Sequence, residues 1–317
     1  MPNRSTRAAS AALLFVALSP FASASVPVQR GVVADDAHAQ ILLMRPEGGI
    51  EAIDAASGRT RWTSAAGDLP LFVDANRVVA LRDAPERGVL ALAVLDASSG
   101  ATIAQPYAEI PAPARALVDE RLGERFEIVP EAGTGRFAWS YTLETVPGAV
   151  LTDANRVVGS GETDLDSAAA RGRIVLSGVV AVDAGTAATT VTVDARPAAV
   201  GLRSVETRDH AGLGGRRFLS PDATHVLASE RSGPERYEWR VHARNGAALG
   251  AVETPYAHAP FAVLGETLVY TTPLRLDRTG AGVAISPVGV DAVDLKSGRT
   301  LWRRELRDTT YRGPWPP

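Results

Sequence analysis

Histidines and acidic side chains are the residues of this chain that most readily supply metal ligands and acid–base groups. The five histidines are His38, His210, His225, His242 and His258. No two of them are spaced i, i+4, the spacing that places two zinc ligands on one face of a helix. The spacing therefore indicates no zinc site, although residues far apart in sequence can still converge in space.

An acidic stretch, Gly161–Asp166, carries the oxygen ligands that calcium prefers. A calcium-binding loop of the D-x-D-x-D/N-G type would need an acid or amide where Ala168 stands and a glycine where Ala169 stands. We therefore expect a solvated loop rather than a calcium site.

A glycine-rich stretch, Gly212–Arg217, has the composition of a phosphate-binding loop. It lacks the Gly-Lys-Ser/Thr of a P-loop and the full G-x-G-x-x-G spacing of a dinucleotide-binding turn. The following Ser220-Pro221-Asp222 predicts a turn and not the helix that such a loop requires. We expect a flexible connection.

Nucleophilic catalysis also finds little support. The chain has no cysteine and no G-x-S-x-G elbow, and its single lysine, Lys296, falls in a predicted hairpin turn, where a buried Schiff-base lysine is not expected. The sequence therefore predicts no catalytic, cofactor-binding or metal-binding residue, and it favours a protein that is not an enzyme and that holds no cofactor.

Composition and net charge indicate which classes of partner the chain can bind. Among 317 residues, 45% are hydrophobic and 22% are charged, which is ordinary for a globular protein, and the formal net charge is −3. A nucleic-acid-binding protein normally needs a basic patch, so we expect no nucleic-acid partner.

The N-terminus has the order of a secretory signal. Arg4 and Arg7 precede a short apolar run, Ala11–Leu18, and Ala22-Ser23-Ala24 is a small-x-small cleavage site. We expect residues 1–24 to be a signal peptide and the mature protein to be periplasmic or secreted, the alternative being a buried N-terminal helix. The run is shorter than the roughly 20 residues of a membrane-spanning helix, and a chain without cysteine has no lipobox, so we expect neither a membrane span nor a lipid anchor.

A repeated segment is the strongest organising signal. Ile50–Trp62 (IEAIDAASGRTRW) and Val290–Trp302 (VDAVDLKSGRTLW) align without gaps. Leu92–Ala104 keeps the Asp, Ser, Gly and Thr of this pattern. Weaker copies are predicted at Gly135–Trp139, which keeps G-R-x-x-W, and at Val180–Asp183 and Val241–Gly246.

A second motif recurs between these copies. DANRVV occurs identically at Asp74–Val79 and Asp153–Val158, at a separation that fits two periods of about 40 residues. Related segments are Asp36–Leu42, Asp222–Leu227 and Leu264–Val269. Since the two motifs alternate, one unit is predicted to be a corner followed by a new strand.

The local chemistry of the first motif predicts a hairpin. The Asp54 side chain can bond to the backbone a few residues on, Gly58 can take a positive φ, and Arg59–Trp62 alternates as the next strand. Pro113–Leu122 is the only stretch that suggests a short helix, with a loop as the alternative.

The pattern A-x-D-x-x-S/T-G-x-x-x-W resembles the repeat of PQQ-like β-propellers, which occur in quinoprotein alcohol dehydrogenases and in outer-membrane assembly lipoproteins. Ala52, Asp54, Gly58 and Trp62 match it, as do the equivalent residues from Ala292 to Trp302. Ser220–Val226 also resembles propeller repeats of the TolB type. The resemblance implies an all-β fold, a single propeller of four-stranded blades over residues 25–308, with seven blades expected and six as the alternative.

Trp62, Trp139 and Trp302 recur at one repeat position, so we expect them to pack between neighbouring blades, the alternative being an aromatic ligand site. PQQ dehydrogenases also hold calcium with acidic and amide side chains and often have a vicinal cysteine pair, and no residue here matches those ligands.

A protein- or peptide-binding scaffold of the cell envelope is therefore the leading prediction. The alternatives are a quinone-dependent dehydrogenase, a hydrolase with a site in the central channel, and a small-ligand or glycan binder with Tyr107, Tyr256 and Tyr270 at the channel mouth. The Pro-rich residues 309–317 are either a docking tail or a segment that packs back through Tyr311 and Trp315.

Overall fold

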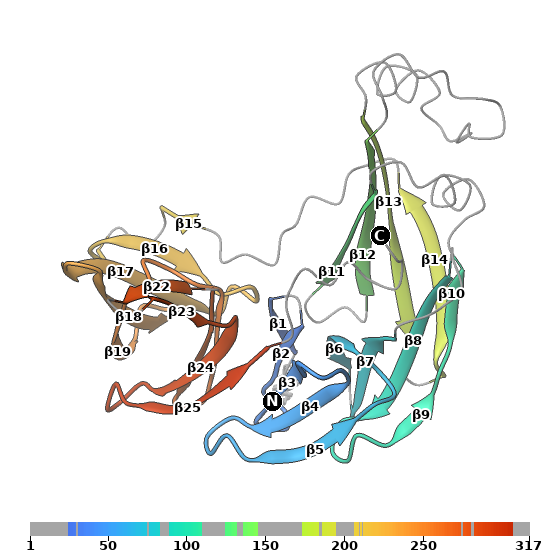
Figure 1. Cartoon of the computed structure of the whole chain (residues 1–317), viewed down its shortest axis with the longest axis horizontal. Coiled ribbons are helices and arrows are strands. Elements are labelled where there is room, and N and C mark those ends of the chain that lie inside the picture. The colour runs from blue at the N-terminus through green and yellow to red at the C-terminus, as the bar shows by residue number, and fades with distance from the viewer. Residues whose placement is uncertain are drawn as a thin grey trace, which may run out of the picture.

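The computed structural model describes residues 25–29, 31–74, 76–82, 89–109, 124–131, 136–144, 173–183, 186–194, 206–208, 210, 212–273, 275–279 and 282–306 (Figure 1). Within these ranges all regular structure is β-strand, arranged in antiparallel sheets, which confirms the all-β prediction. The same ranges contain no helix of the length and apolarity needed to cross a bilayer. The predicted signal peptide (1–24), the tail (309–317), Pro113–Leu122 and Gly161–Asp166 lie outside the described residues.

Two sheets come from the N-terminal third of the chain. The first sheet runs in chain order through β1 (Val26–Gln29), β2 (Val32–Asp35), β3 (Gln40–Met44), β4 (Ile50–Asp54) and β5 (Thr60–Ser64). The second sheet contains β6 (Leu69–Asp74), β7 (Arg77–Leu81) and β8 (Val89–Asp96), and both β9 (Thr102–Ala104) and β10 (Tyr107–Glu109) pair with β8.

Three more sheets and a hairpin follow. The third sheet is β11 (Glu124–Glu131), β12 (Arg136–Glu144), β13 (Arg173–Asp183) and β14 (Ala188–Asp194). The fourth is β15 (Glu206–Thr207), β16 (Arg216–Leu219), β17 (His225–Gly233), β18 (Arg236–Ala243) and β19 (Ala248–Thr254). The fifth is β20 (Phe261–Leu264), β21 (Thr267–Thr272), β24 (Gly289–Asp294) and β25 (Thr300–Glu305), and β22 (Arg275–Thr279) pairs with β23 (Gly282–Ser286).

The predicted hairpin corner is present in the first, second and fifth sheets. The Gly58 amide donates to the Asp54 carbonyl at 2.8 Å, and the Ser57 amide donates to Asp54 Oδ1 at 2.8 Å. Hydrogen bonds from Arg61 and then from Ser57 lower the pKa of Asp54 to about 2. The three corner glycines have φ of 66°, 71° and 67° at Gly58, Gly100 and Gly298. The carboxylate at this position therefore serves the turn.

One backbone hydrogen bond ties each corner to the turn that the second motif predicts. The donor is the amide of the residue that directly follows the first residue of the corner, as Ala55 follows Asp54. The acceptor is a backbone carbonyl in the turn, at 2.8–3.0 Å. The pairs are Ala55 to Ala39, Ala97 to Asn76, Arg244 to Thr224 and Leu295 to Glu266. Four of the five sheets thus share one internal plan, as the alternation of the two motifs predicted.

One assignment from the repeat is wrong. Trp139 lies on β12, the second strand of its sheet, whereas Trp62 and Trp302 lie on β5 and β25, the last strands of theirs. The first DANRVV copy connects β6 to β7 in the second sheet, whereas the second copy lies outside the described residues.

Buried clusters show which sheets are neighbours. One apolar cluster joins the first and second sheets, another joins the fourth and fifth, and a third joins the fifth sheet to the first. Strand β14 of the third sheet contacts β10 of the second, and Thr189 Oγ1 donates to the Tyr107 carbonyl at 3.0 Å. Figure 1 shows the resulting arrangement, in which the last sheet of the chain packs beside the first. The described residues form five such sheets, so the predicted seven or six blades are not reached within them.

Candidate functional site at the junctions between sheets

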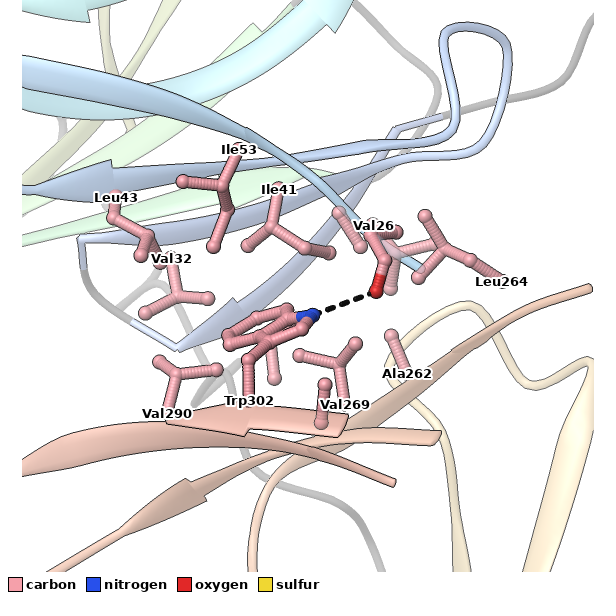
Figure 2. Packing of buried hydrophobic residues seen from close by; sticks show 14 of the residues in the cluster. Val26, Val32, Ile41, Leu43, Ile53, Ala262, Leu264, Val269, Val290 and Trp302 are labelled. Atoms are coloured by element: carbon pink, nitrogen blue, oxygen red, sulfur yellow. Dashed lines mark hydrogen bonds between the residues drawn. The ribbon is translucent and has the colours of Figure 1, made fainter. Parts of the chain in front are cut away.

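Tryptophan docking holds two of the junctions together. Trp302 Nε1 donates to the Ala55 carbonyl at 2.8 Å, and Trp62 Nε1 donates to the Ala97 carbonyl at 2.9 Å. Figure 2 shows the Trp302 indole between β25 and the first sheet, with Val32, Ile41 and other apolar side chains around it. The packing interpretation is thus confirmed for Trp62 and Trp302.

The corner glycine makes room for the indole. A Cβ on Gly58 would lie 2.5 Å from Cγ of Trp302, and a Cβ on Gly100 would lie 2.4 Å from Cε3 of Trp62. Glycine is therefore required at this position for two reasons: its φ is positive, and the indole ring approaches its α-carbon closely.

The junction between the fourth and fifth sheets uses a different pair. Gly250 pairs with Val241 on β18 just as Trp62 pairs with Ala52 on β4, so a glycine stands at the tryptophan position. A Cβ on Gly250 would lie 1.9 Å from the Leu295 carbonyl oxygen. Leu295 in turn stands where the other corners have Ala55 and Ala97. At this junction the small residue, Gly250, is on the outer strand and the large residue, Leu295, is at the corner, which reverses the tryptophan–alanine arrangement. No feature of the sequence indicated this exchange.

Replacing Gly250 with alanine is expected to destabilise the fold by about 1–3 kcal/mol, because the new methyl group would overlap a backbone carbonyl that cannot move away cheaply. Gly250 is not among the residues with positive φ, so the effect would come from packing alone. Urea unfolding checks this. Gly233→Ala is the matched control on the same sheet, since its Cβ would meet no atom closer than 3.8 Å, and equal costs for the two variants would contradict the contact.

A polar network crosses the junction between the first and second sheets. His38 Nδ1 lies 2.7 Å from Asp35 Oδ2, and His38 Nε2 lies 2.7 Å from Asn76 Oδ1. Gln40 Nε2 donates to Asp35 Oδ2 and to the Ala97 carbonyl, both at 2.9 Å. Asp35 and Gln40 are buried, so one end of the network is built into the junction, whereas His38 and Asn76 reach its surface.

A second polar cluster lies across neighbouring strands β21, β24 and β25 of the fifth sheet. Buried Asp291 accepts two bonds of 2.6 Å from Arg303, whose side chain is 69% exposed, and one of 3.4 Å from the Tyr270 hydroxyl. Burial and then the Asp291 carboxylate raise the pKa of Tyr270. This environment favours the neutral form of the Tyr270 hydroxyl. It packs edge-on against Trp239 and Tyr256, in the core of the junction.

The three tyrosines proposed for a channel mouth do not all come together. Tyr270 is buried on β21 and touches Tyr256, whereas Tyr107 is 54% exposed on β10 of the second sheet, beneath Arg82. Among the residues that the structure describes, these side chains form no common ligand site.

The other candidate residues are also separated. His225 and His242 lie on β17 and β18, where burial lowers the pKa of His225, and His258 stacks on Phe218. Within the described ranges no three His, Asp or Glu side chains are grouped so that they could hold a metal ion.

The glycine-rich stretch and the lysine have structural partners. Gly212–Arg217 leads into strand β16, and Arg217 donates to the His210 and Leu213 carbonyls at 3.2 Å. Lys296 forms an ion pair with Glu266 across two turns of the fifth sheet.

Strands β5, β9 and β25 carry many exposed residues. In the described structure β5, β9 and β25 each have a paired neighbour on one side only. Ile103 on β9 is 45% exposed and Leu301 on β25 is 41% exposed, and both occupy the repeat position just before the tryptophan position. An unpaired strand edge with an exposed apolar side chain can accept an extended peptide as a further strand.

Comparison with known proteins adds structures of low similarity. No family model and no curated protein matches the chain. It is similar to BamB from Moraxella catarrhalis, with 14% identity, a TM-score of 0.22 and coverage of 86% of this chain and 75% of that one. It is also similar to a europium-containing methanol dehydrogenase (12%, 0.22, 84% and 67%) and to an uncharacterized protein from Listeria monocytogenes EGD-e (10%, 0.30, 90% and 85%). TM-scores this low carry no argument about the fold of this chain.

Proposed function

We propose that this chain is an exported β-propeller whose sheets are blades, and that it acts as a non-catalytic scaffold for a protein or peptide in the cell envelope. The observation that carries the proposal is the set of one-sided outer strands, two of which expose Ile103 and Leu301. Backbone groups at such an edge supply affinity, and alternate side chains supply selectivity.

The polar clusters support the same proposal. The carboxylates of Asp35, Asp54 and Asp291 are each bonded to side chains of the same or the adjacent sheet. These carboxylates are occupied by hydrogen bonds within the protein. We therefore propose the outer strand edges as the surface that binds a partner.

Photo-crosslinking in intact cells tests the proposal. A photoreactive residue at Ile103 or Leu301 is expected to give a discrete adduct with an envelope protein. A Leu301→Lys substitution in the protein labelled at Ile103 then shows whether a change at one edge reduces the adduct formed at the other. The exposed turn residue Asn245 is the matched control position. No adduct at either edge, or the same adducts from Asn245, would contradict the scaffold. A calcium-dependent rise in Tm with PQQ would instead support the dehydrogenase alternative.

A further inference from the structure

The His38 ring is held between two side-chain oxygen atoms, each of which can only accept a hydrogen bond. Its Nδ1 faces Asp35 Oδ2 and its Nε2 faces Asn76 Oδ1, both at 2.7 Å. The orientation of the Asn76 amide is fixed, because its Nδ2 donates to Asp96 Oδ2 at 3.2 Å. Both imidazole nitrogens must therefore donate, and only the imidazolium cation has two N–H groups.

The charges around the ring match a cation. Asp35 is 1% exposed and lies on β2, and Asp96 lies beyond Asn76 at the end of β8. Arg61 on β5 donates to the His38 carbonyl and to Asp54 Oδ2, both at 2.6 Å, so its charge is balanced by Asp54.

Asp36 belongs to the same turn and adds a further negative charge, which also acts on His225 of the fourth sheet. The carboxylates bonded to the ring are Asp35 directly and Asp96 through Asn76.

We propose that protonated His38 is a clasp between the first and second sheets, and that loss of its proton opens the clasp. A neutral imidazole has one N–H and one lone pair, so either Asp35 or Asn76 would face a lone pair. Turning the Asn76 amide would only move the repulsion to Asp96. The bonds from Gln40 and Trp62 to the Ala97 carbonyl carry no titratable group, so the sheets stay packed but are held less firmly.

The sign of the pH dependence follows from this geometry. The clasp stabilises the folded protein while His38 is protonated, and its contribution is lost at higher pH, where the ring gives up its proton. The inference holds whatever partner the chain binds, because it concerns a junction inside the fold.

A double-mutant cycle at two pH values tests the clasp. Tm is measured for the wild type, His38→Gln, Asn76→Ala and the double variant at about pH 5.5 and about pH 8. Asn76 and the His38 ring lie at the surface of the turns, so folded variants are expected. At the lower pH the two substitutions should be coupled by a Tm difference of about 2–4 °C, and at the higher pH the coupling should fall to within about 1 °C.

The cycle separates the clasp from a general effect of histidine charge. Removing a charge that does not touch Asn76 would change Tm in both backgrounds equally and leave no coupling. Coupling that is equal at the two pH values, or larger at the higher one, would overturn the proposal.

Discussion

Replacing Trp302 with alanine is expected to cost about 3–5 kcal/mol in the free energy of unfolding, the range for removing a large buried aromatic side chain. The indole is 8% exposed and belongs to the cluster that joins the fifth sheet to the first. Its loss would leave a cavity there and would leave the Ala55 carbonyl without its donor. The midpoint of urea unfolding measures the effect.

Two controls define the origin of that cost. Trp302→Phe keeps most of the apolar contact and removes the N–H, so about 1–3 kcal/mol is expected. Leu301→Ala changes the neighbouring residue on the same strand, which is exposed, and should remain within about 0.5 kcal/mol. If Trp302→Ala cost no more than Leu301→Ala, the junction between the last and first sheets would be wrong.

Replacing Gly58 with alanine is expected to cost about 2–4 kcal/mol, from a positive φ and from overlap with Trp302. The new Cβ would lie 2.5 Å from Cγ of the indole. Thermal or urea unfolding checks this prediction.

Gly298→Ala is the matched control for the Gly58 substitution. Its φ of 67° is almost the same, but the nearest atom to its Cβ would be the Ala251 carbonyl oxygen at 3.2 Å. This neighbour needs to shift by only a few tenths of an ångström, so the substitution should cost mainly the backbone strain of about 1–2 kcal/mol. In a Trp302→Ala background, Gly58→Ala should fall to the same value, and an unchanged cost in that background would refute the contact.

The parts of the fold that could be predicted are those fixed by neighbouring residues. The Asp54–Gly58 corner depends on one side-chain bond and one positive φ within five positions, so its sequence is sufficient to identify it. The recurrence of tryptophan at Trp62 and Trp302 indicated packing between sheets, since a residue that repeats with the unit most simply serves the unit.

The parts that could not be predicted depend on pairing over long distances. Trp139 matches G-R-x-x-W, but the match says nothing about which strand of a sheet carries it. The Gly250–Leu295 contact was missed because the Val241–Gly246 copy has neither the corner aspartate nor the tryptophan. The role of Asn76 was missed because its partner His38 lies on another sheet, and asparagine in a turn motif is explained by the turn alone.

The most direct measurement for this account is the nuclear Overhauser effect between Trp302 and Gly58 in protein selectively labelled at tryptophan and glycine. The structure places the last sheet against the first, with the indole ring against the Gly58 α-carbon and its N–H on the Ala55 carbonyl. It predicts a strong cross-peak between the Trp302 ring protons and a Gly58 α-proton, with slow exchange of the indole N–H. A fast-exchanging indole N–H and no cross-peak to Gly58 would contradict it.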